Sequence, residues 1–336
     1  MELTGLQKQV LTRIQARFPI ERHPYEVLAE AFGVSETDVL AAVEELRAGG
    51  VIRRIGAIFD SHRLGYRSTL CAAAAPPSRV DDVAAVVSSY PNVTHNYLRE
   101  DRYNVWFTLI ARSRERIEAI LEEISAETGV TDILDLPAIR LFKIRVDFDL
   151  TGGPTARTAP PPVVKPAETS AVELTSDERE LAVLLQGDVA GSATPFAAIA
   201  ASLRRRGVDA DEAWALERTR EWVDTGVIRR FGAAIRHHET GFTSNAMGVW
   251  VCPEERIEEV GTTMASFPEV SHCYQRPIAP TWPGNLYTMI HGRSREDVET
   301  TASRIRDAVG LEMPRLLYSL KEFKKTSMTY FAEGEE

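Results

Sequence analysis

One sequence pattern occurs twice in this chain of 336 residues, and it limits the possible folds more than any other feature. The pattern P-x-V-x-H-x-Y-x-R spans residues 91–99 and again residues 268–276. In a β-strand successive side chains point to opposite faces, so the Val, His, Tyr and Arg of each copy are expected to share one face. Two such faces predict two related folded units, each with a candidate site.

The surroundings of the two patterns repeat as well. The string V-I-R-R-x-G-A occurs at 51–57 and at 227–233, Asn104 corresponds to Asn285, and R-S-R-E recurs at 112–115 and 293–296. The repeat therefore extends over both halves of the chain. Two such halves are expected to bury their open sheet faces against each other, as a covalent pseudo-dimer.

Each half begins with a helical segment. In residues 6–50 the apolar residues recur at helical spacing, Gly33 separates two helices, and Ser35 with Asp38 gives a capping-box signature. These features indicate a helix-turn-helix. Residues 66–150 then read as strand, helix, strand, strand, helix, strand, the ferredoxin-like order. The cleanly alternating stretch 140–150 is expected to be the last of these strands.

We therefore predict an α+β fold, a tandem repeat of a winged helix-turn-helix head and a ferredoxin-like β-α-β-β-α-β domain. The proline-rich stretch between the halves is expected to be an extended linker. The predicted boundaries are head 1 at 1–50, ferredoxin-like domain 1 at 51–150, the linker at 151–175, head 2 at 176–226 and ferredoxin-like domain 2 at 227–332.

Composition restricts the class of protein. The formal net charge of −10 opposes nonspecific binding to nucleic acid, because such binding depends on neutralising phosphates. No apolar run reaches the length of a membrane span, and the N-terminus lacks a signal-peptide pattern, so we expect a cytoplasmic protein. The three cysteines include no CxxC pair, so the sequence supports neither a disulfide framework nor a cysteine zinc site.

A helix-turn-helix followed by a β-α-β-β-α-β domain resembles the leucine-responsive, AsnC-type transcription regulators. That resemblance covers nearly the whole of each half and implies DNA binding. The third helix of each head, however, is acidic: residues 36–47 carry four carboxylates and one arginine, and residues 209–224 carry six carboxylates and two arginines. Phosphate would repel such helices. We therefore expect the heads to serve in packing or dimerisation.

A second family shares this architecture, and the chain is similar to a fused two-subunit member of it, the siroheme (sirohaem) decarboxylases. The V-I-R-R-x-G-A strings carry this resemblance, together with P-N-V-T-H-N-Y-L-R at 91–99, Y-N-V-W-F-T at 103–108, P-E-V-S-H-C-Y-Q-R at 268–276 and W-P-G-N-L-Y-T-M-I-H-G at 282–292. The two halves differ after the motif, with E-D-R at 100–102 and the longer P-I-A-P-T at 277–281, so the two pockets are expected to differ.

The resemblance implies removal of carbon dioxide from the acetate side chains on rings C and D (C12 and C18) of siroheme, which gives 12,18-didecarboxysiroheme. This product would feed either d-type haem or an alternative route to haem b. The implied partners are siroheme and its product, with no nucleic acid and no membrane, and either a homo-oligomer or partner decarboxylase subunits. No tightly bound cofactor is expected, because the substrate carries its own iron.

The motif residues suit this chemistry. Arginine pairs bidentately with carboxylates, which makes Arg99 and Arg276 expected anchors. The macrocycle can take up the electrons left by decarboxylation, and a histidine or tyrosine can supply the proton. We assign His95 and His272 as acid or as axial ligand of the substrate iron. Tyr97 and Tyr274 are assigned as proton donors or orienting groups.

Further residues are expected to bind substrate. They are Arg53, Arg54, Asn104, Trp106, Arg229, Arg230, His238 and Asn285. In each arginine doublet one side chain must face solvent, because neighbours on a strand point opposite ways. His291 has no histidine counterpart in the first half, where Ile110 aligns, and is expected to be a core or edge histidine. Two alternatives remain open: a regulator that senses a small molecule or haem, and a noncatalytic tetrapyrrole carrier.

Overall fold

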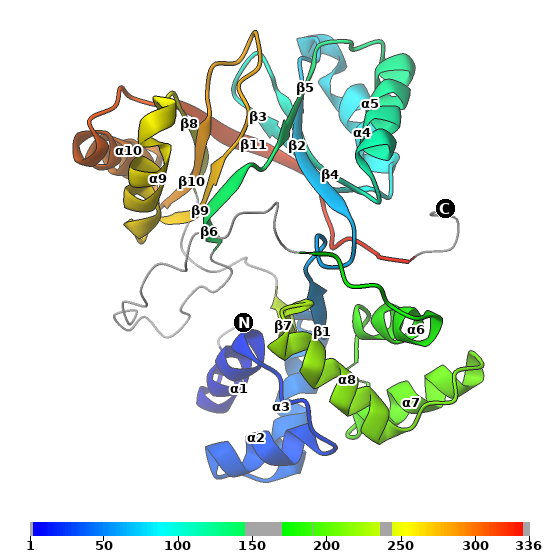
Figure 1. Ribbon diagram of the computed structural model, residues 1–336. Helices are drawn as coiled ribbons and strands as arrows, with labels where there is room; N and C mark the ends of the chain where they lie inside the picture. The colour runs from blue at the N-terminus through cyan, green and yellow to red at the C-terminus, as the bar shows by residue number, and fades with distance from the viewer. Residues whose placement is uncertain (1–2, 145–169, 190, 236–243, 332–336) are drawn as a thin grey trace.

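The computed structural model describes residues 3–144, 170–189, 191–235 and 244–331, and has two layers (Figure 1). Helical heads form one layer, and a large sheet flanked by helices forms the other. His238, the second part of the predicted strand 140–150 and most of the predicted linker lie outside the described residues. Within the described residues, no helix is long and apolar enough to cross a membrane.

The first head is a three-helix unit whose ends are fixed by local capping. Thr4 and Ser35 each form a capping box with the residue three positions on, and Gly33 ends the second helix in the left-handed conformation. The second head repeats this plan, with caps at Thr175 and Asp211. The helices are α1 (Gly5–Ala16), α2 (Pro24–Phe32), α3 (Glu36–Ala48), α6 (Ser176–Leu185), α7 (Pro195–Arg205) and α8 (Glu212–Asp224).

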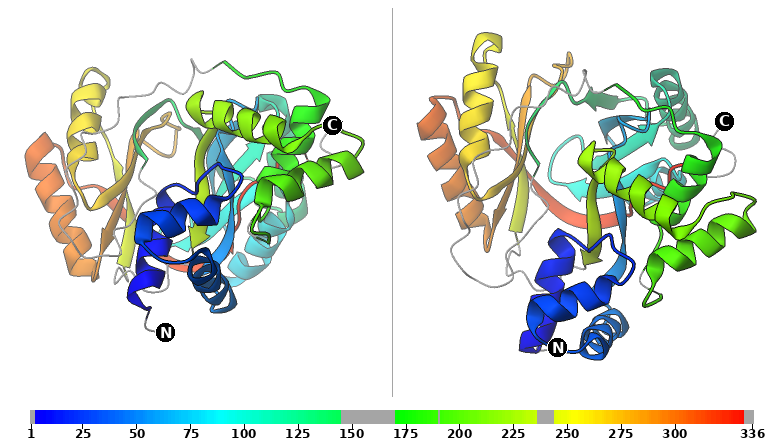
Figure 2. Two further views of the ribbon diagram at one scale, coloured as in Figure 1. Left: turned by 90° about the horizontal axis from the view of Figure 1, so that it is seen from below. Right: turned by 60° about the horizontal axis from the view of Figure 1, so that its bottom comes forward.

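The two heads are joined by a two-stranded antiparallel ladder (Figure 2). Strands β1 (Ile52–Phe59) and β7 (Ile228–Ile235) pair with Gly56 opposite Gly232, and both heads share one apolar core with this ladder. Strands β1 and β7, which follow the expected boundaries at 50 and 226, thus pack with the heads and not with the large sheet. Met328 and Tyr330, at the end of the chain, also return to this core.

Each V-I-R-R-x-G-A string has a structural explanation in this ladder. A Cβ on Gly56 would overlap carbonyl oxygens of Leu185 and Gly187 at the end of α6, and a Cβ on Gly232 would overlap that of Ile14 in α1. Only glycine permits this approach of each strand to the first helix of the opposite head. The string is therefore a signature of head-to-head packing.

Two ferredoxin-like units form the second layer. The first has strand order β5-β2-β4-β3, and the second has β11-β8-β10-β9. The first unit contains β2 (Arg67–Ala73), the 3-10 turn η1 (Pro77–Arg79), α4 (Val80–Ser89), β3 (Val93–Arg99), β4 (Val105–Ala111), α5 (Arg114–Thr128) and β5 (Ile133–Pro137). The second contains β8 (Ser244–Trp250), η3 (Glu254–Arg256), α9 (Ile257–Ser266), β9 (Val270–Gln275), β10 (Leu286–Gly292), α10 (Arg295–Val309) and β11 (Arg315–Lys325).

The halves exchange strands at their C-terminal ends. Strand β11 pairs with β8 through residues 315–318 and then with β3 of the other half through residues 319–325. Strand β6 (Arg140–Ile144) crosses in the opposite direction and pairs with β9. The prediction that 140–150 closes the first unit was wrong, because the short strand β5 takes that place beside β2. The exchange unites both units in one nine-stranded sheet.

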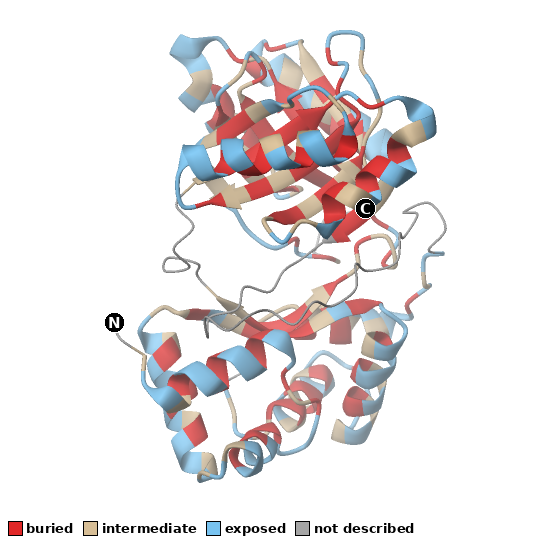
Figure 3. Ribbon diagram, turned by 90° about the vertical axis from the view of Figure 1, so that its left-hand side faces the viewer, coloured by how far each residue is buried: buried red, intermediate tan, exposed pale blue. Residues whose placement is uncertain are grey.

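The sheet has an outer and an inner face. Helices α4 and α5 cover the outer face of one half, and α9 and α10 cover that of the other (Figure 1). The solvent side of these helices is exposed, whereas the strands are largely buried (Figure 3). Besides the core of the heads and the two cores under these helix pairs, there is an inner core where the inner faces of the two halves meet. In it the Trp106 and Trp282 rings lie 5.7 Å apart. Trp282 belongs to the longer connection of the second half, so this connection breaks the twofold symmetry.

Candidate functional site

The two motif strands each contain a β-bulge that changes the predicted face. In β3 the bulge lies between Val93 and His95, so Val93 packs into the outer core under α4 and α5. In β10–β9 the irregularity lies beside Val270, which packs into the outer core under α9 and α10. The prediction that Val shares the face of His, Tyr and Arg was therefore wrong, because one extra residue reverses the alternation.

His, Tyr and Arg of each motif do lie together, on the inner face. The His95 and Tyr97 rings are stacked with centroids 6.3 Å apart, and the Arg99 guanidinium lies 5.7 Å from the centre of the Tyr97 ring. In β9 the corresponding ring distance, from His272 to Tyr274, is 6.2 Å. The structure thus forms two related rows of imidazole, phenol and guanidinium, one from each half.

The two histidines are near enough to affect each other electrostatically. Burial lowers the pKa of His272 to about 4, and positive charge on His291, His95, Arg276 and Lys143 contributes to that shift. Burial also lowers the pKa of His95, to which Lys325 contributes in the same direction. Both imidazoles are therefore neutral near pH 7 in the free protein, with one protonated and one unprotonated ring nitrogen each.

A hydroxyl on each bulge contacts the adjacent histidine. The Thr94 hydroxyl lies 3.0 Å from Nδ1 of His95, and the Ser271 hydroxyl lies 2.8 Å from Nδ1 of His272. Ser271 also lies 2.7 Å from Nε2 of His291. The second half therefore has a chain of three hydrogen-bonding groups, and His291 takes part in it instead of being a simple core or edge residue.

The motif arginines are buried cations with unused hydrogen-bonding capacity. Arg99 is 5% exposed and donates to the carbonyl of Leu317 at 3.0 Å, and Arg276 donates to that of Leu136 at 2.5 Å. The buried Nε atoms of Arg99 and Arg276 have no hydrogen-bond partner among the described residues. Burial lowers the pKa of Arg99 to about 10, so it stays charged at neutral pH. A buried N–H without a partner suits an incoming carboxylate.

The exchanged strands make the two rows chemically different. Opposite Tyr97 and His95 lie Glu322 and Lys325 of β11, and the Tyr97 hydroxyl donates to Glu322 at 3.2 Å. Opposite Tyr274 lies Leu141 of β6. Within the described residues the Tyr274 hydroxyl has no hydrogen-bond partner. The first row thus has a carboxylate and an ammonium group opposite it, whereas an aliphatic side chain lies opposite Tyr274 in the second.

Other predicted substrate-binding residues have structural contacts. Arg54 donates to the carbonyls of Ala57 and Gly187, and Arg230 donates to those of Gln15 and Ala233. These carbonyls lie at helix ends or in the ladder, so Arg54 and Arg230 stabilise head packing and the prediction that they bind substrate is not supported by their contacts.

Their neighbours, Arg53 and Arg229, are exposed on the ladder. Arg229 forms an ion pair with Asp60 at 2.8 Å, and its charge acts to lower the pKa of Tyr274 against the larger effect of burial. Arg229 thus acts electrostatically on a motif tyrosine of the inner face.

Asn104 and Asn285 hold the ends of strands. The Asn104 amide bonds to the backbone N–H and carbonyl of Ala75, and Asn285 does the same at Cys252. Trp106 is buried in the inner core and donates to the carbonyl of Tyr103 at 2.6 Å. The polar side-chain atoms of these three residues are bonded to backbone groups. Their role in the structure is therefore to hold the strands that carry the rows.

Sequence reasoning missed five contributors to the candidate site: Thr94, Ser271, His291, Glu322 and Lys325. A signal existed for the first two, because a hydroxyl residue precedes the histidine in both copies of the motif. No comparable signal existed for Glu322 and Lys325, because the exchange of β11 between halves is not visible in local periodicity.

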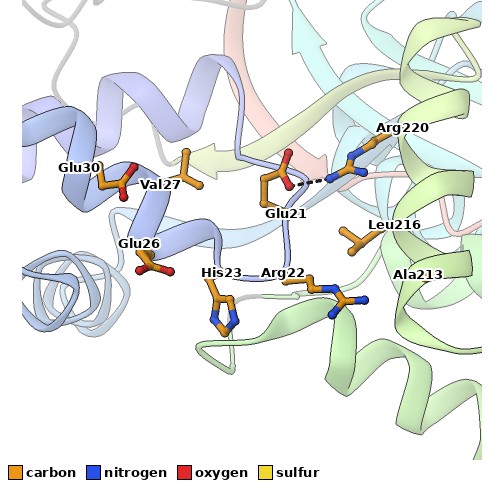
Figure 4. A pocket seen from close by; sticks show the side chains of 9 residues that line it. All are labelled: Glu21, Arg22, His23, Glu26, Val27, Glu30, Ala213, Leu216 and Arg220. Carbon is orange, nitrogen blue, oxygen red and sulfur yellow. Dashed lines mark hydrogen bonds and ion pairs between the residues drawn. The ribbon is translucent and has the colours of Figure 1, made fainter.

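A cavity of about 430 Å³ lies in the helical heads, away from the inner face (Figure 4). Its wall carries the carboxylates of Glu21, Glu26 and Glu30 but also the guanidinium groups of Arg22 and Arg220, and Arg220 pairs with Glu21 at 2.6 Å. No motif residue lines this cavity, so the inner face of the sheet, which holds both His-Tyr-Arg rows, is the candidate site. Among the described residues, no group of three or more His, Cys, Asp or Glu could hold a metal ion.

Comparison with known proteins agrees with this architecture. The profile described as "Siroheme decarboxylase NirDL-like HTH domain" matches residues 7–53, and the "AsnC-like ligand binding domain" profile matches 63–143 and 239–324. The siroheme decarboxylase of Hydrogenobacter thermophilus is 34% identical over 337 residues, which cover 98% of this chain and 96% of that protein. The chain belongs to the siroheme decarboxylase family.

Two further relatives show how this family member is built. The siroheme decarboxylase alpha subunit of Nitratidesulfovibrio vulgaris is 51% identical over 146 residues, 44% of this chain and 82% of that subunit. Crystal structures of the siroheme decarboxylase NirDL, alone and in complex with an iron-uroporphyrin III analogue, match with a TM-score of 0.76 and 32% identity over 98% of this chain and 95% of theirs. The repeat of this chain thus corresponds to two subunit-sized units joined in one siroheme decarboxylase-type polypeptide.

Proposed function

We propose that this chain decarboxylates siroheme on the inner face of its nine-stranded sheet. The observation that carries the proposal is the pair of His-Tyr-Arg rows, brought together by strand exchange in a protein of this family. The reaction removes the ring C and D acetate carboxylates and yields 12,18-didecarboxysiroheme. In class the enzyme would be a carboxy-lyase.

The arginines provide the anchoring. Arg99 and Arg276 each direct a buried, unpartnered Nε–H from one row, so two separate carboxylates of one macrocycle can be held. A charge-assisted hydrogen bond to a buried guanidinium is about twice as strong as a neutral one. The planar ring system would lie against aromatic residues of the inner core, of which Tyr287 and Trp106 flank the rows.

The remaining inner surface favours loss of carbon dioxide. The reacting carboxylate loses its charge in the product, so an apolar wall such as that opposite Tyr274 disfavours the substrate more than the product. The bond from the acetate CH2 to its carboxylate breaks, the electron pair is delocalised into the macrocycle, and the carbon takes up a proton to become a methyl group. His272, His95 or a motif tyrosine would donate that proton.

The metal in this reaction belongs to the substrate. A neutral histidine can ligate the iron of siroheme, and both His95 and His272 are neutral near pH 7. We propose that no further tightly bound cofactor is required, because the macrocycle itself accepts the electrons. Protein partners would be a second copy of the chain or other decarboxylase subunits.

Contacts of the third helices do not favour the regulator alternative. In α8, Arg218 pairs with Glu221 at 2.5 Å and Arg220 pairs with Glu21 at 2.6 Å. In α3, Arg47 pairs with Asp188 of the other head. These arginines are engaged within the protein, and the remaining charge of both helices is negative, so neither helix offers a cationic surface to DNA.

The test is anaerobic incubation of the purified full chain with siroheme, followed by mass spectrometry of the pigment. The proposal predicts loss of two carbon dioxide units. A tetrapyrrole carrier would shift the absorption spectrum of siroheme and leave its mass unchanged, and a regulator would retard DNA fragments at low salt. Either of these results without a mass change contradicts the proposal.

A further inference from the structure

At one position of the inner face the two halves of the repeat carry chemically different residues. His291 on β10 corresponds to Ile110 on β4. Ile110 packs into the apolar core of the heads, whereas Nε2 of His291 lies 2.7 Å from the Ser271 hydroxyl. The same hydroxyl lies 2.8 Å from Nδ1 of His272, so one serine bridges two imidazoles. In the first half, among the described residues, the Thr94 hydroxyl contacts a single imidazole, that of His95.

We propose that His291 is a positioning residue which, through Ser271, orients the proton on His272 and makes the second-half row the proton-donating one. This inference rests on the proposed decarboxylation and names the residue that would prepare its proton donor. The evidence for it is geometric. Ser271 and His272 of β9 and His291 of β10 form a row in which each side chain lies within hydrogen-bonding distance of the next.

The bridging hydroxyl has one proton, and this limits the arrangement. If Nε2–H of His291 donates to the Ser271 oxygen, the serine O–H is free to donate to Nδ1 of His272. Nδ1 is then the acceptor, so the proton of the neutral His272 ring must be on Nε2. That N–H is the one available to a substrate on the inner face. Without His291, Ser271 can equally accept from Nδ1, and the proton on Nε2 is lost.

The transfer balances. The carbon–carboxylate bond of the acetate breaks, carbon dioxide leaves, and the CH2 carbon takes the Nε2 proton of His272. Ser271 passes its proton to Nδ1 of His272, and His291 passes its Nε2 proton to Ser271 while its Nδ1 takes one from solvent, which can reach it because His291 is half-exposed. All three side chains end neutral. The net change is one carboxylate and one proton converted to a methyl group and carbon dioxide.

The groups around His272 determine what can fix the position of its proton. The charged or titratable groups that face it are His291, His95, Arg276 and Lys143, all of them basic. On the opposite strand the partner position is Ile144. Among the described residues, no hydrogen bond or ion pair joins His272 to a carboxylate, and its Nδ1 contacts the Ser271 hydroxyl instead. A neighbouring acidic side chain therefore does not set its tautomer as Asp does in many catalytic histidine sites. Assigning the donor to His272 leaves His95 as the candidate axial ligand of the substrate iron.

One experiment reads the tautomer without turnover. Nitrogen-15 NMR of histidine-labelled full chain at neutral pH distinguishes a protonated from an unprotonated Nδ1. In the wild type, His272 should have its proton on Nε2. In His291→Ile, which installs the residue of the first half, a mixture of tautomers is expected, and His291→Gln should restore the wild-type signal because its amide can donate to Ser271. Identical His272 spectra in wild type and His291→Ile would overturn the inference.

Kinetics with siroheme test the same point independently. His291→Ile and Ser271→Ala should each lower kcat about tenfold or more, as expected when one general acid is disordered, and leave KM within about twofold. Ser271→Thr, which introduces the hydroxyl residue of the first half, should recover most of kcat. His23→Gln, in an exposed head position, is the control. A change in KM alone, or unchanged kcat in both variants, contradicts the inference; an inactive wild type with the predicted tautomer contradicts only the decarboxylase proposal.

Discussion

The Tyr97 hydroxyl donates a hydrogen bond of 3.2 Å to Glu322, a carboxylate that the other half of the chain supplies through β11. The corresponding position opposite Tyr274 is Leu141. A fixed negative charge therefore stands at the edge of the first row and not at the corresponding position of the second. For a polyanionic substrate this charge is unfavourable, and it makes the two rows electrostatically different.

Replacing Glu322 by Gln should strengthen siroheme binding. The variant keeps the size of the side chain and can still accept from Tyr97, but it removes one like charge from the substrate's surroundings. Because Glu322 is exposed and solvent screens its charge, such a charge contributes about 1 kcal/mol, or roughly fivefold in Kd. Titration of the siroheme absorption band at low salt measures this. Glu312→Gln, at an exposed loop position, is the matched control; equal affinities in both variants would count against a substrate near Glu322.

Replacing Arg99 or Arg276 by Lys should weaken binding although the charge is kept. Lysine lacks the planar fork, and the unpartnered Nε–H of each arginine would be lost. We expect Kd for siroheme to rise about tenfold in each variant, the cost of one charge-assisted hydrogen bond. Arg205→Lys, on the surface of α7, should bind as the wild type does. Unaltered binding by both motif variants would exclude these arginines as anchors.

Stability should fall in acid because of His272. Its pKa is lowered from 6.5 to about 4 in the folded chain, so protons bind the unfolded state first as pH drops below about 6.5. The loss grows until about pH 4 and amounts to about 3 kcal/mol. Denaturation of wild type and His272→Gln should therefore show a difference in unfolding free energy that declines by this amount from pH 7 to pH 4. His23→Gln should follow the wild type, and a pH-independent difference for His272→Gln would refute the buried, neutral state.

The heads offer a test of their packing. Gly56→Ala and Gly232→Ala place a Cβ against backbone carbonyls of the opposite head, where no flexible side chain can move aside. We expect each to lower the unfolding free energy by about 1–3 kcal/mol or more. Gly5→Ala meets no atom within 4 Å and lies in α1, so it should be neutral or stabilising. Equal melting temperatures for all three variants would show that the close approach is not required.

Local patterns in the sequence were enough to predict much of the fold. Capping residues such as Ser35, the helical spacing of apolar residues and the repeat itself gave the helix-turn-helix heads and the ferredoxin-like units. The exchange of β6 and β11 could not be predicted, because pairing partners far apart in the chain leave no local period. Strand β5 was missed because it is short and follows a helix directly, while the alternation after Arg140 was more conspicuous.

The sequence was enough to predict which motif residues lie together in the candidate site, but not the full geometry of the strands that carry them. His95, Tyr97 and Arg99 share a face as expected, but the bulge beside Val93 turned that residue to the other side. A bulge adds one unpaired residue and has no clear sequence signature, so simple alternation fails there. The contacts of Arg54 could not be predicted from the sequence for a different reason: one of its two carbonyl acceptors, Gly187, lies in the other head, far away along the chain.

The most direct test of the central claim is the mass of siroheme after anaerobic incubation with wild type and with a His95→Gln/His272→Gln double variant. The account predicts loss of two carbon dioxide units with the wild type. The double variant should still bind siroheme, as seen in its absorption spectrum, and return it with its mass unchanged. A double variant that decarboxylates siroheme at the wild-type rate would contradict the assignment of this face as the active site.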